Sequence, residues 1–234
     1  MWTYLIILLS LSLVLGIFFR RLYLYNKGPV APIAELVEES ELPEKKRISK
    51  ANRARAEALS KKGDRLIKAG KEDEAIKCFV QALAIDALHQ ETQHKLAVLY
   101  LQKHLYGAAA ALFKQLSEIS PDPVHFSHLG LALYSQSDFE NAKSAYQKAV
   151  ELDDSRPQRF VSLSQVYRSI GQLQHAVIAL NKALAIEGDN MEFLFLMADL
   201  QISLGNTEGA KEILKKVLEI EPNNKDASAM LKGL

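Results

Sequence analysis

Apolar and polar residues alternate along most of this chain with the three-and-four spacing of amphipathic helices. Within residues 123–156 the apolar positions form two such stripes: Phe126, Leu129 and Leu133, then Ala142, Tyr146 and Ala149. The segment between the stripes, Ser135-Gln-Ser-Asp138, is polar and turn-prone. The two stripes must therefore fold back on each other, which predicts a helical hairpin.

The same hairpin pattern recurs along the chain at intervals of 33 or 34 residues. The alanine that opens the second stripe recurs as Ala75, Ala109, Ala142, Ala176 and Ala210. The small residue of the first stripe recurs in step as Gly63, Ala97, Gly130, Ser164 and Ala198, and the bulky residue of the second as Phe79, Phe113, Tyr146, Leu180 and Leu214. Recurrence in register predicts an all-α solenoid of about five stacked hairpins.

This period, with small residues where paired helices cross, resembles the tetratricopeptide repeat, a helical hairpin of 34 residues. The resemblance implies a repeat domain over 44–234, with repeats at 56–89, 90–123, 123–156, 157–190 and 191–224. Beyond Pro222, apolar residues continue at helical spacing and predict a capping helix over 225–234: Ala227, Met230, Leu231 and Leu234. Because the family binds other proteins, the resemblance implies a protein-binding scaffold.

The stretch Trp2–Phe19 carries no charge and would span roughly 27 Å as a helix, with aromatic residues near both ends. A cleaved signal peptide and a buried core helix are the alternatives. No Lys/Arg segment precedes the stretch, and Phe18-Phe-Arg-Arg21 is no small-residue cleavage site. We therefore expect one N-terminal transmembrane helix, an anchor over residues 1–25.

Basic residues follow the uncharged stretch Trp2–Phe19 and none precedes it: Arg20, Arg21 and Lys27. The positive-inside rule then places the repeats in the cytoplasm. Residues 26–43 are rich in Pro and Glu, which predicts a flexible linker with a root-mean-square span near 24 Å. This layout resembles bacterial membrane-tethered repeat proteins that assist envelope assembly, which implies a single-pass protein of the bacterial inner membrane.

Charge is balanced overall, at +1, but unevenly distributed. Residues 56–234 carry twenty Lys/Arg and twenty-three Asp/Glu, which argues against nucleic acid as a main partner. The membrane-proximal basic residues are Arg20, Arg21, Lys45, Lys46, Arg47 and Lys50. A helix carrying this basic run could lie along anionic headgroups or could simply present a solvated face.

The family turns the first helix of each hairpin toward an inner groove. The resemblance maps the groove to His94, Val98, Leu101, Leu131, Tyr134, Val161, Gln165, Arg168, Phe195 and Asp199. An apolar and aromatic centre of this kind suits an amphipathic or extended segment with apolar anchors. Alternatively, Val98, Leu131 and Val161 pack between helices and leave no pocket. The carboxylate clamp of chaperone-binding relatives is not expected, because Ser60 and Asp64 stand where it needs Lys and Asn.

Catalytic signatures are missing from the sequence: there is no Gly-rich phosphate loop and no nucleophile with an orienting His and Asp. His125 and His128 share a helix face, but the only acid nearby is Asp122, and metal sites need three or four ligands. The lone cysteine, Cys78, rules out an intrachain disulfide and is expected to be a packing or surface residue. We expect no enzyme, no cofactor and no metal.

The sequence thus predicts a membrane-anchored scaffold or adaptor that binds a partner segment in its groove at the cytoplasmic face. A structural or regulatory subunit of a membrane enzyme or envelope-assembly complex, held through its transmembrane helix, is one alternative. A mitochondrial outer-membrane receptor, which shares the anchor-first layout, is another. Homo-oligomerisation also stays open, and the partner cannot be named from the sequence.

Overall fold

The structure is a computed structural model that describes residues 48–234, in which the chain forms eleven α-helices and no strand. The helices are α3 (Lys50–Lys68), α4 (Glu72–Ile85), α5 (Gln90–Gln102), α6 (Tyr106–Ile119), α7 (Pro123–Ser135), α8 (Phe139–Leu152), α9 (Pro157–Ser169), α10 (Leu173–Ile186), α11 (Met191–Ser203), α12 (Thr207–Ile220) and α13 (Lys225–Lys232). The expectation of an all-α fold is confirmed for this part of the chain.

The expected anchor and linker lie outside the described residues, together with Arg20, Arg21, Lys45, Lys46 and Arg47. Among residues 48–234, no helix is both long and apolar enough to cross a membrane.

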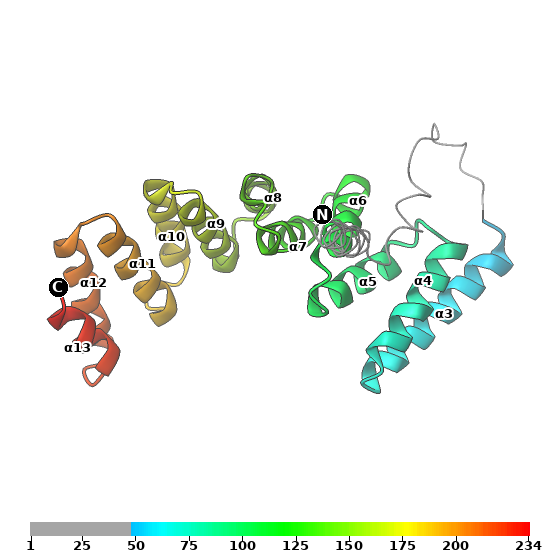
Figure 1. The fold of residues 1–234 in the computed structure, drawn as a ribbon, viewed down its shortest axis with the longest axis horizontal. Helices are drawn as coiled ribbons and strands as arrows, with labels where there is room; N and C mark the ends of the chain where they lie inside the picture. Colours follow the sequence, from blue (N-terminus) through cyan, green and yellow to red (C-terminus); the bar gives the residue numbers. More distant parts are fainter. Residues whose placement is uncertain (1–47) are drawn as a thin grey trace, which may run out of the picture. The chain divides into compact units, whose positions relative to one another are not determined.

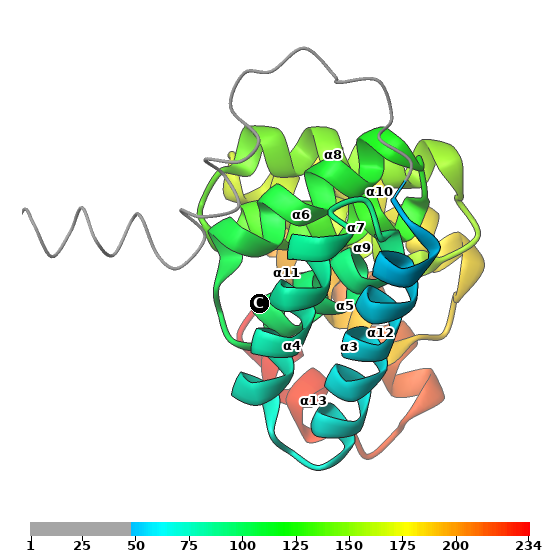
Figure 2. The ribbon, with the colours of Figure 1, turned by 90° about the vertical axis from the view of Figure 1, so that its right-hand side faces the viewer.

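The helices pack as five antiparallel hairpins stacked in sequence order, with α13 on the last one. Each helix contacts mainly the helices just before and after it in the sequence, as in a solenoid. Figure 1 shows the array running from α3 at one end to α13 at the other, and Figure 2 looks at the α3–α4 end. The predicted solenoid of five hairpins is confirmed.

Polar caps and left-handed residues set the ends of the helices. Side chains of Ser49, Asp122, Asp138, Asn190, Asn206 and Asn224 accept backbone N–H groups at helix starts. The turn inside every hairpin contains a residue with positive φ: Gly70, His104, Ser137, Gly171 and Gly205. Glycine takes this conformation without strain, whereas His104 and Ser137 adopt it at a cost.

The paired helices of a hairpin cross so closely that a small residue is required. A Cβ on Gly130 would lie 2.8 Å from two ring carbons of Tyr146, and one on Gly63 would lie 2.5 Å from the Phe79 ring. Both rings are buried. The small and bulky positions that recur in the sequence are therefore the two sides of one contact.

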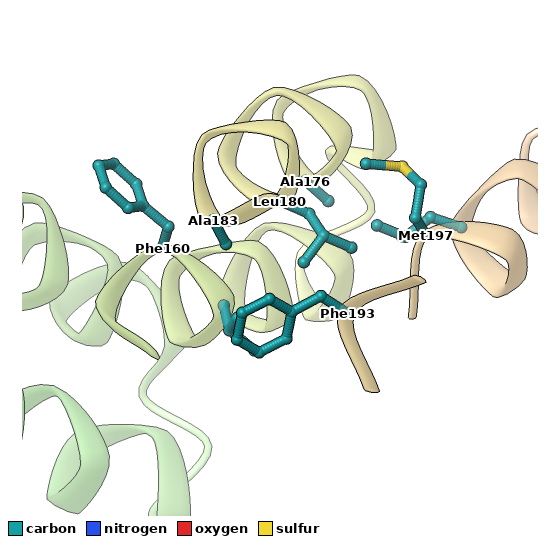
Figure 3. Close-up of a cluster of buried hydrophobic side chains, with 8 residues drawn as sticks. Phe160, Ala176, Leu180, Ala183, Phe193 and Met197 are labelled. Carbon is teal, nitrogen blue, oxygen red and sulfur yellow. The ribbon is translucent and has the colours of Figure 1, made fainter. Parts of the chain in front are cut away.

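The apolar core is continuous from one repeat to the next. Figure 3 shows Leu180 of α10 beside Phe193 of α11, and Phe160 of α9 belongs to the same buried cluster, on the side of Ala183. Phe193 is fully buried, so repeat five completes the core of repeat four. At the end of the array, Ala227 of α13 is fully buried against Leu214 and Val217, and α13 thereby covers the last apolar face.

A buried arginine joins the third repeat to the fourth. The side chain of Arg159 is 5% exposed and donates from Nη1 to the Asp153 carbonyl at 2.9 Å and to the Asp153 carboxylate at 2.5 Å. Its Nε donates to Ser127 Oγ at 3.3 Å. Hydrogen bonds from the Ser155 hydroxyl and from Arg159 hold the pKa of the Asp153 carboxyl well below its usual range. The sequence pattern did not indicate this clamp.

Candidate partner-binding face

The first helices of the hairpins, α3, α5, α7, α9 and α11, contact one another through side chains; we call their shared surface the inner face. The contacts follow the array in order: Ser60 with Thr92 at 2.9 Å, Asp64 with Lys95 at 2.8 Å, Ser127 with Arg159 at 3.3 Å, Tyr134 with Ser169 at 3.1 Å and Arg168 with Asp199 at 2.6 Å. Imidazole rings make the remaining junction, between α5 and α7. Neighbouring first helices are therefore linked by side chains along the whole array, in part through the buried Ser60, Thr92 and Arg159.

Most of the residues expected to line a groove keep part of their side chain at this surface. His94, Val98, Leu101, Tyr134, Phe195 and Asp199 are half-buried, and Leu131, Gln165 and Arg168 are exposed. Val161 is the exception: it is 6% exposed and packs with Phe160 and Phe193 in the core. Val161 therefore packs between helices, which was the alternative to a place in the groove. Leu131 does not follow this alternative, because it is 43% exposed.

The centre of the inner face combines an aromatic ring with an ion pair. Tyr134 lies beside Phe139, with ring centroids 5.3 Å apart, and its hydroxyl is within hydrogen-bond distance of Ser169 Oγ. Arg168 Nη1 contacts Asp199 Oδ2 at 2.6 Å, and both side chains remain a little under half exposed. The guanidinium and the carboxylate can therefore still bind a group from solvent.

An open hollow of about 440 Å³ adjoins this ion pair at the C-terminal end of the inner face. It is lined by Glu192, Phe195, Leu196, Asp199 and Met230, from α11 and α13. Phe195 and Asp199 were expected on this surface. Met230 was expected only to pack in the capping helix, and its place in the hollow depends on how α13 docks.

Acidic residues near the first repeat are held in ion pairs rather than left open. Asp64 contacts Lys95, and Glu57 contacts Lys61 at 3.1 Å and His89 at 3.2 Å. The hydrogen bond from Lys61 is the main reason that the pKa of Glu57 is lowered. The charges of these acidic side chains, at the α3 end of the inner face, are thus largely neutralised by neighbouring residues.

A cluster of histidines fills the junction between α5 and α7. The ring centroid of His94 lies 5.4 Å from that of His125 and 5.9 Å from that of His128, and His128 lies 4.9 Å from the Phe113 ring. His128 Nδ1 is buried with no hydrogen-bond partner among the described residues. Burial, and then the neighbouring imidazoles, lower the pKa values of His94 and His128.

No group of three or more His, Cys, Asp or Glu within residues 48–234 is placed to hold a metal ion. His94, one of the residues expected to contact a partner, packs against Phe113 and the other two histidines, and part of its side chain stays at the surface. Cys78 is 6% exposed and packs in the core of the first repeat. The histidines of the cluster and Cys78 thus make packing contacts in the structure.

Comparison with known families assigns the chain to a class. Profiles described as tetratricopeptide repeat match residues 60–122, 126–156 and 167–234. The matched residues take in nearly all of the hairpins described above. The chain belongs to the tetratricopeptide repeat family, and its fold is that of a family of protein-interaction scaffolds.

Solved structures show the same fold. A crystal structure of MamA superposes with a TM-score of 0.69 at 23% identity and covers 73% of this chain and 94% of that one. MamA from Desulfovibrio magneticus RS-1 gives a TM-score of 0.67 at 16% identity, covering 73% and 97%. YrrB, described as a TPR protein with an unusual peptide-binding site, gives 0.65 at 17% identity, covering 88% and 98%. The search of curated proteins returned no significant match.

Proposed function

We propose that this protein is a membrane-anchored adaptor that binds an extended or amphipathic segment of a partner protein along its inner face. The observation that carries the proposal is the surface from Tyr134 to Met230. There, half-buried aromatic and apolar side chains surround the Arg168–Asp199 pair beside an open hollow. Apolar anchors set around a few polar groups are typical of segment-binding grooves.

Each part of this surface has a separate role in the proposal. Tyr134 is a large, rigid anchor that loses little conformational entropy on binding. Arg168 offers a planar cation to a carboxylate or an aromatic ring of the segment. The hollow between Phe195 and Met230 takes an apolar side chain. The peptide-binding site of YrrB supports this use of the fold, although the identity of 17% carries no residue-level assignment.

Membrane anchoring and a cytoplasmic inner face are the other parts of the proposal. They rest on the uncharged stretch Trp2–Phe19 and on the basic residues that follow it, Arg20, Arg21 and Lys27. Carbonate extraction of membranes should leave the protein in the pellet. Protease added outside intact cells or spheroplasts should spare the repeats and should digest them after lysis. Release into the supernatant would refute the anchor, and digestion before lysis would reverse the orientation.

The groove is tested with the full chain as bait in solubilised membranes. A segment of a captured partner is then labelled, and its affinity is measured by fluorescence polarisation. Replacing Tyr134→Ala together with Arg168→Glu should weaken binding about thirtyfold, since truncating an anchor commonly costs about 2 kcal/mol. A matched pair on outer helices, Ile178→Ala with Lys114→Glu, changes the same residue classes on exposed positions and should leave the affinity unchanged.

A third variant separates the charge of Arg168 from its ion pair. Exchanging both partners, Arg168→Glu with Asp199→Arg, keeps the pair but moves the cation to α11. If the bound segment contacts the cation at its position on α9, the affinity for the segment should fall while the melting temperature of the variant stays unchanged. Unchanged affinity in the Tyr134→Ala, Arg168→Glu variant, with normal melting, would place recognition elsewhere. Loss of the partner on deleting residues 1–43 would favour a subunit held through its membrane helix.

A further inference from the structure

Helix α3 carries a one-sided band of positive charge, which we call the basic face. Its members are all exposed: Lys50, Arg55, Lys61, Lys62, Arg65 and Lys68. With 3.6 residues per turn, they fall within an arc of about 140°. This arc is centred opposite Ala56, Ser60 and Gly63, the buried residues with which α3 packs on the array. The basic face therefore points away from the rest of the repeats.

The acidic residues of α3 lie outside that arc and are already engaged. Asp64 contacts Lys95 of α5 at 2.8 Å, and Glu57 contacts His89 at 3.2 Å. Within residues 48–234, Lys61 is the one member of the basic face that makes an ion pair, with Glu57 at 3.1 Å. The positive charge of the face is thus left largely without counterions from the described part of the protein.

Helix stability does not account for these cations. Basic residues near a helix C-terminus are favourable, which explains Arg65 and Lys68, but near the N-terminus they oppose the helix dipole. The first turn of α3 contains no acidic residue, and Lys50, Arg53 and Arg55 lie close to its start. At 19 residues, α3 is also six residues longer than α5 or α7, and Lys50 to Arg55 are all exposed. An external anionic partner would account for the exposed, basic extension of α3.

The shape and surroundings of the face favour a planar anion. A helix of 19 residues presents a straight band about 28 Å long, and Figure 2 shows α3 and α4 at the free end of the array, in front of the other labelled helices. Residues 56–234 carry a small excess of acid, which would repel a long polyanion that followed the array. The basic band begins about thirty residues after the uncharged stretch Trp2–Phe19.

We propose that the basic face of α3 docks on an anionic phospholipid leaflet and so orients the repeat array against the membrane. This inference rests on the proposed membrane anchor, which would hold α3 near the bilayer through a linker with a span near 24 Å. Each basic side chain close to an anionic surface favours the docked state about fivefold. With α3 flat on the leaflet, the array is held by two attachments, the anchor and this helix.

The test places a reporter at the centre of the face. Ala58 is exposed between the basic side chains, whereas Cys78 is 6% exposed and shielded from labelling. The full chain with Ala58→Cys carries an environment-sensitive fluorophore and is assembled into lipid nanodiscs whose headgroups bear a quencher. Discs of phosphatidylcholine are compared with discs containing about 30% phosphatidylserine. We expect strong quenching with phosphatidylserine only, and its loss at about 0.5 M NaCl.

Charge variants assign the effect to the face. Replacing Arg55, Lys62 and Arg65 by Gln should lower the docked population about a hundredfold, since three charges are removed. A matched triple, Lys114→Gln, Lys215→Gln and Lys225→Gln, changes the net charge equally at exposed positions on other helices and should not reduce the quenching. A fluorophore at Ala111→Cys, exposed on α6, should stay unquenched in both lipids.

The outcomes separate docking from anchoring. A chain that enters the discs but shows no dependence on phosphatidylserine at position 58 refutes docking and leaves the anchor standing. A chain that fails to enter the discs, yet floats with phosphatidylserine vesicles in a way that needs Arg55, Lys62 and Arg65, refutes the anchor and supports docking. A single-stranded oligonucleotide that binds through these three residues more tightly than the vesicles do would make nucleic acid the partner and overturn the proposal.

Discussion

The close crossing of α7 and α8 gives a quantitative prediction for Gly130→Ala. The added Cβ would lie 2.8, 2.8 and 2.9 Å from three ring carbons of Tyr146, whereas carbon atoms in contact normally stay about 3.5 Å or more apart. The Tyr146 ring is 5% exposed and has little room to move. Overpacking of this kind costs about 1–3 kcal/mol, and the better helix propensity of alanine returns about 1 kcal/mol.

We therefore expect Gly130→Ala to destabilise fragment 44–234 by up to about 2 kcal/mol, a fall in melting temperature of up to about 8 °C. Thermal unfolding followed by circular dichroism at 222 nm measures this directly. Gly107→Ala on α6 is the matched control, because its added Cβ would meet only Gln136 Oε1 at an ordinary 3.5 Å. It should melt at or slightly above the temperature of the parent.

A second substitution tests the cause. Repeats four and five carry leucine at the bulky position and Ser164 or Ala198 at the small one. Tyr146→Leu should therefore relieve the clash, so that Gly130→Ala costs less in that background than in the parent. If Gly130→Ala melts as high as Gly107→Ala, the Tyr146 ring can move away from the added Cβ, and the predicted clash is refuted. Repeat two, which combines Ala97 with Phe113, already accommodates a Cβ at the small position beside an aromatic ring.

Three further predictions concern the same fragment. Arg159→Ala should lower the free energy of unfolding, measured by denaturant titration, by about 2 kcal/mol. The loss is smaller than for a fully buried pair because the Asp153 side chain stays 31% exposed. An unchanged midpoint would show that the contact between Arg159 and Asp153 is not stabilising. The melting temperature should fall as the pH drops from 7.5 to 5.5: the folded pKa values of His94 and His128 lie below the unfolded value of about 6.5, so the unfolded chain binds more protons over this interval. His128→Leu should reduce that slope, and an equal slope would exclude the histidine cluster as its source. Ser137→Gly should stabilise by up to about 1 kcal/mol, because Ser137 has a φ of 62°, and a lower melting temperature would contradict a strained turn.

The sequence by itself determined the repeating unit, because the relevant contacts are local. Residues three and four apart share a helix face, and the residues that touch within one hairpin are close in the sequence. A pattern repeated five times therefore reveals both the helix faces and the contacts between paired helices. Gly130 and Tyr146 are an example: the recurring small and bulky positions predicted the crossing that the structure contains. The helical hairpins, their order and the family followed from this pattern alone.

The tertiary structure decided which residues of different repeats meet. Arg168 and Asp199 are 31 positions apart, and whether they pair depends on the twist between neighbouring hairpins, which no single helix encodes. The same twist brings His94 to His128 and turns Val161 into the core instead of onto the inner face. It also carries Met230 of α13 to the edge of the hollow. Binding surfaces of solenoids are built from such contacts between repeats. The sequence could therefore predict which helices carry the candidate site, but only the packed array shows which of their side chains lie together.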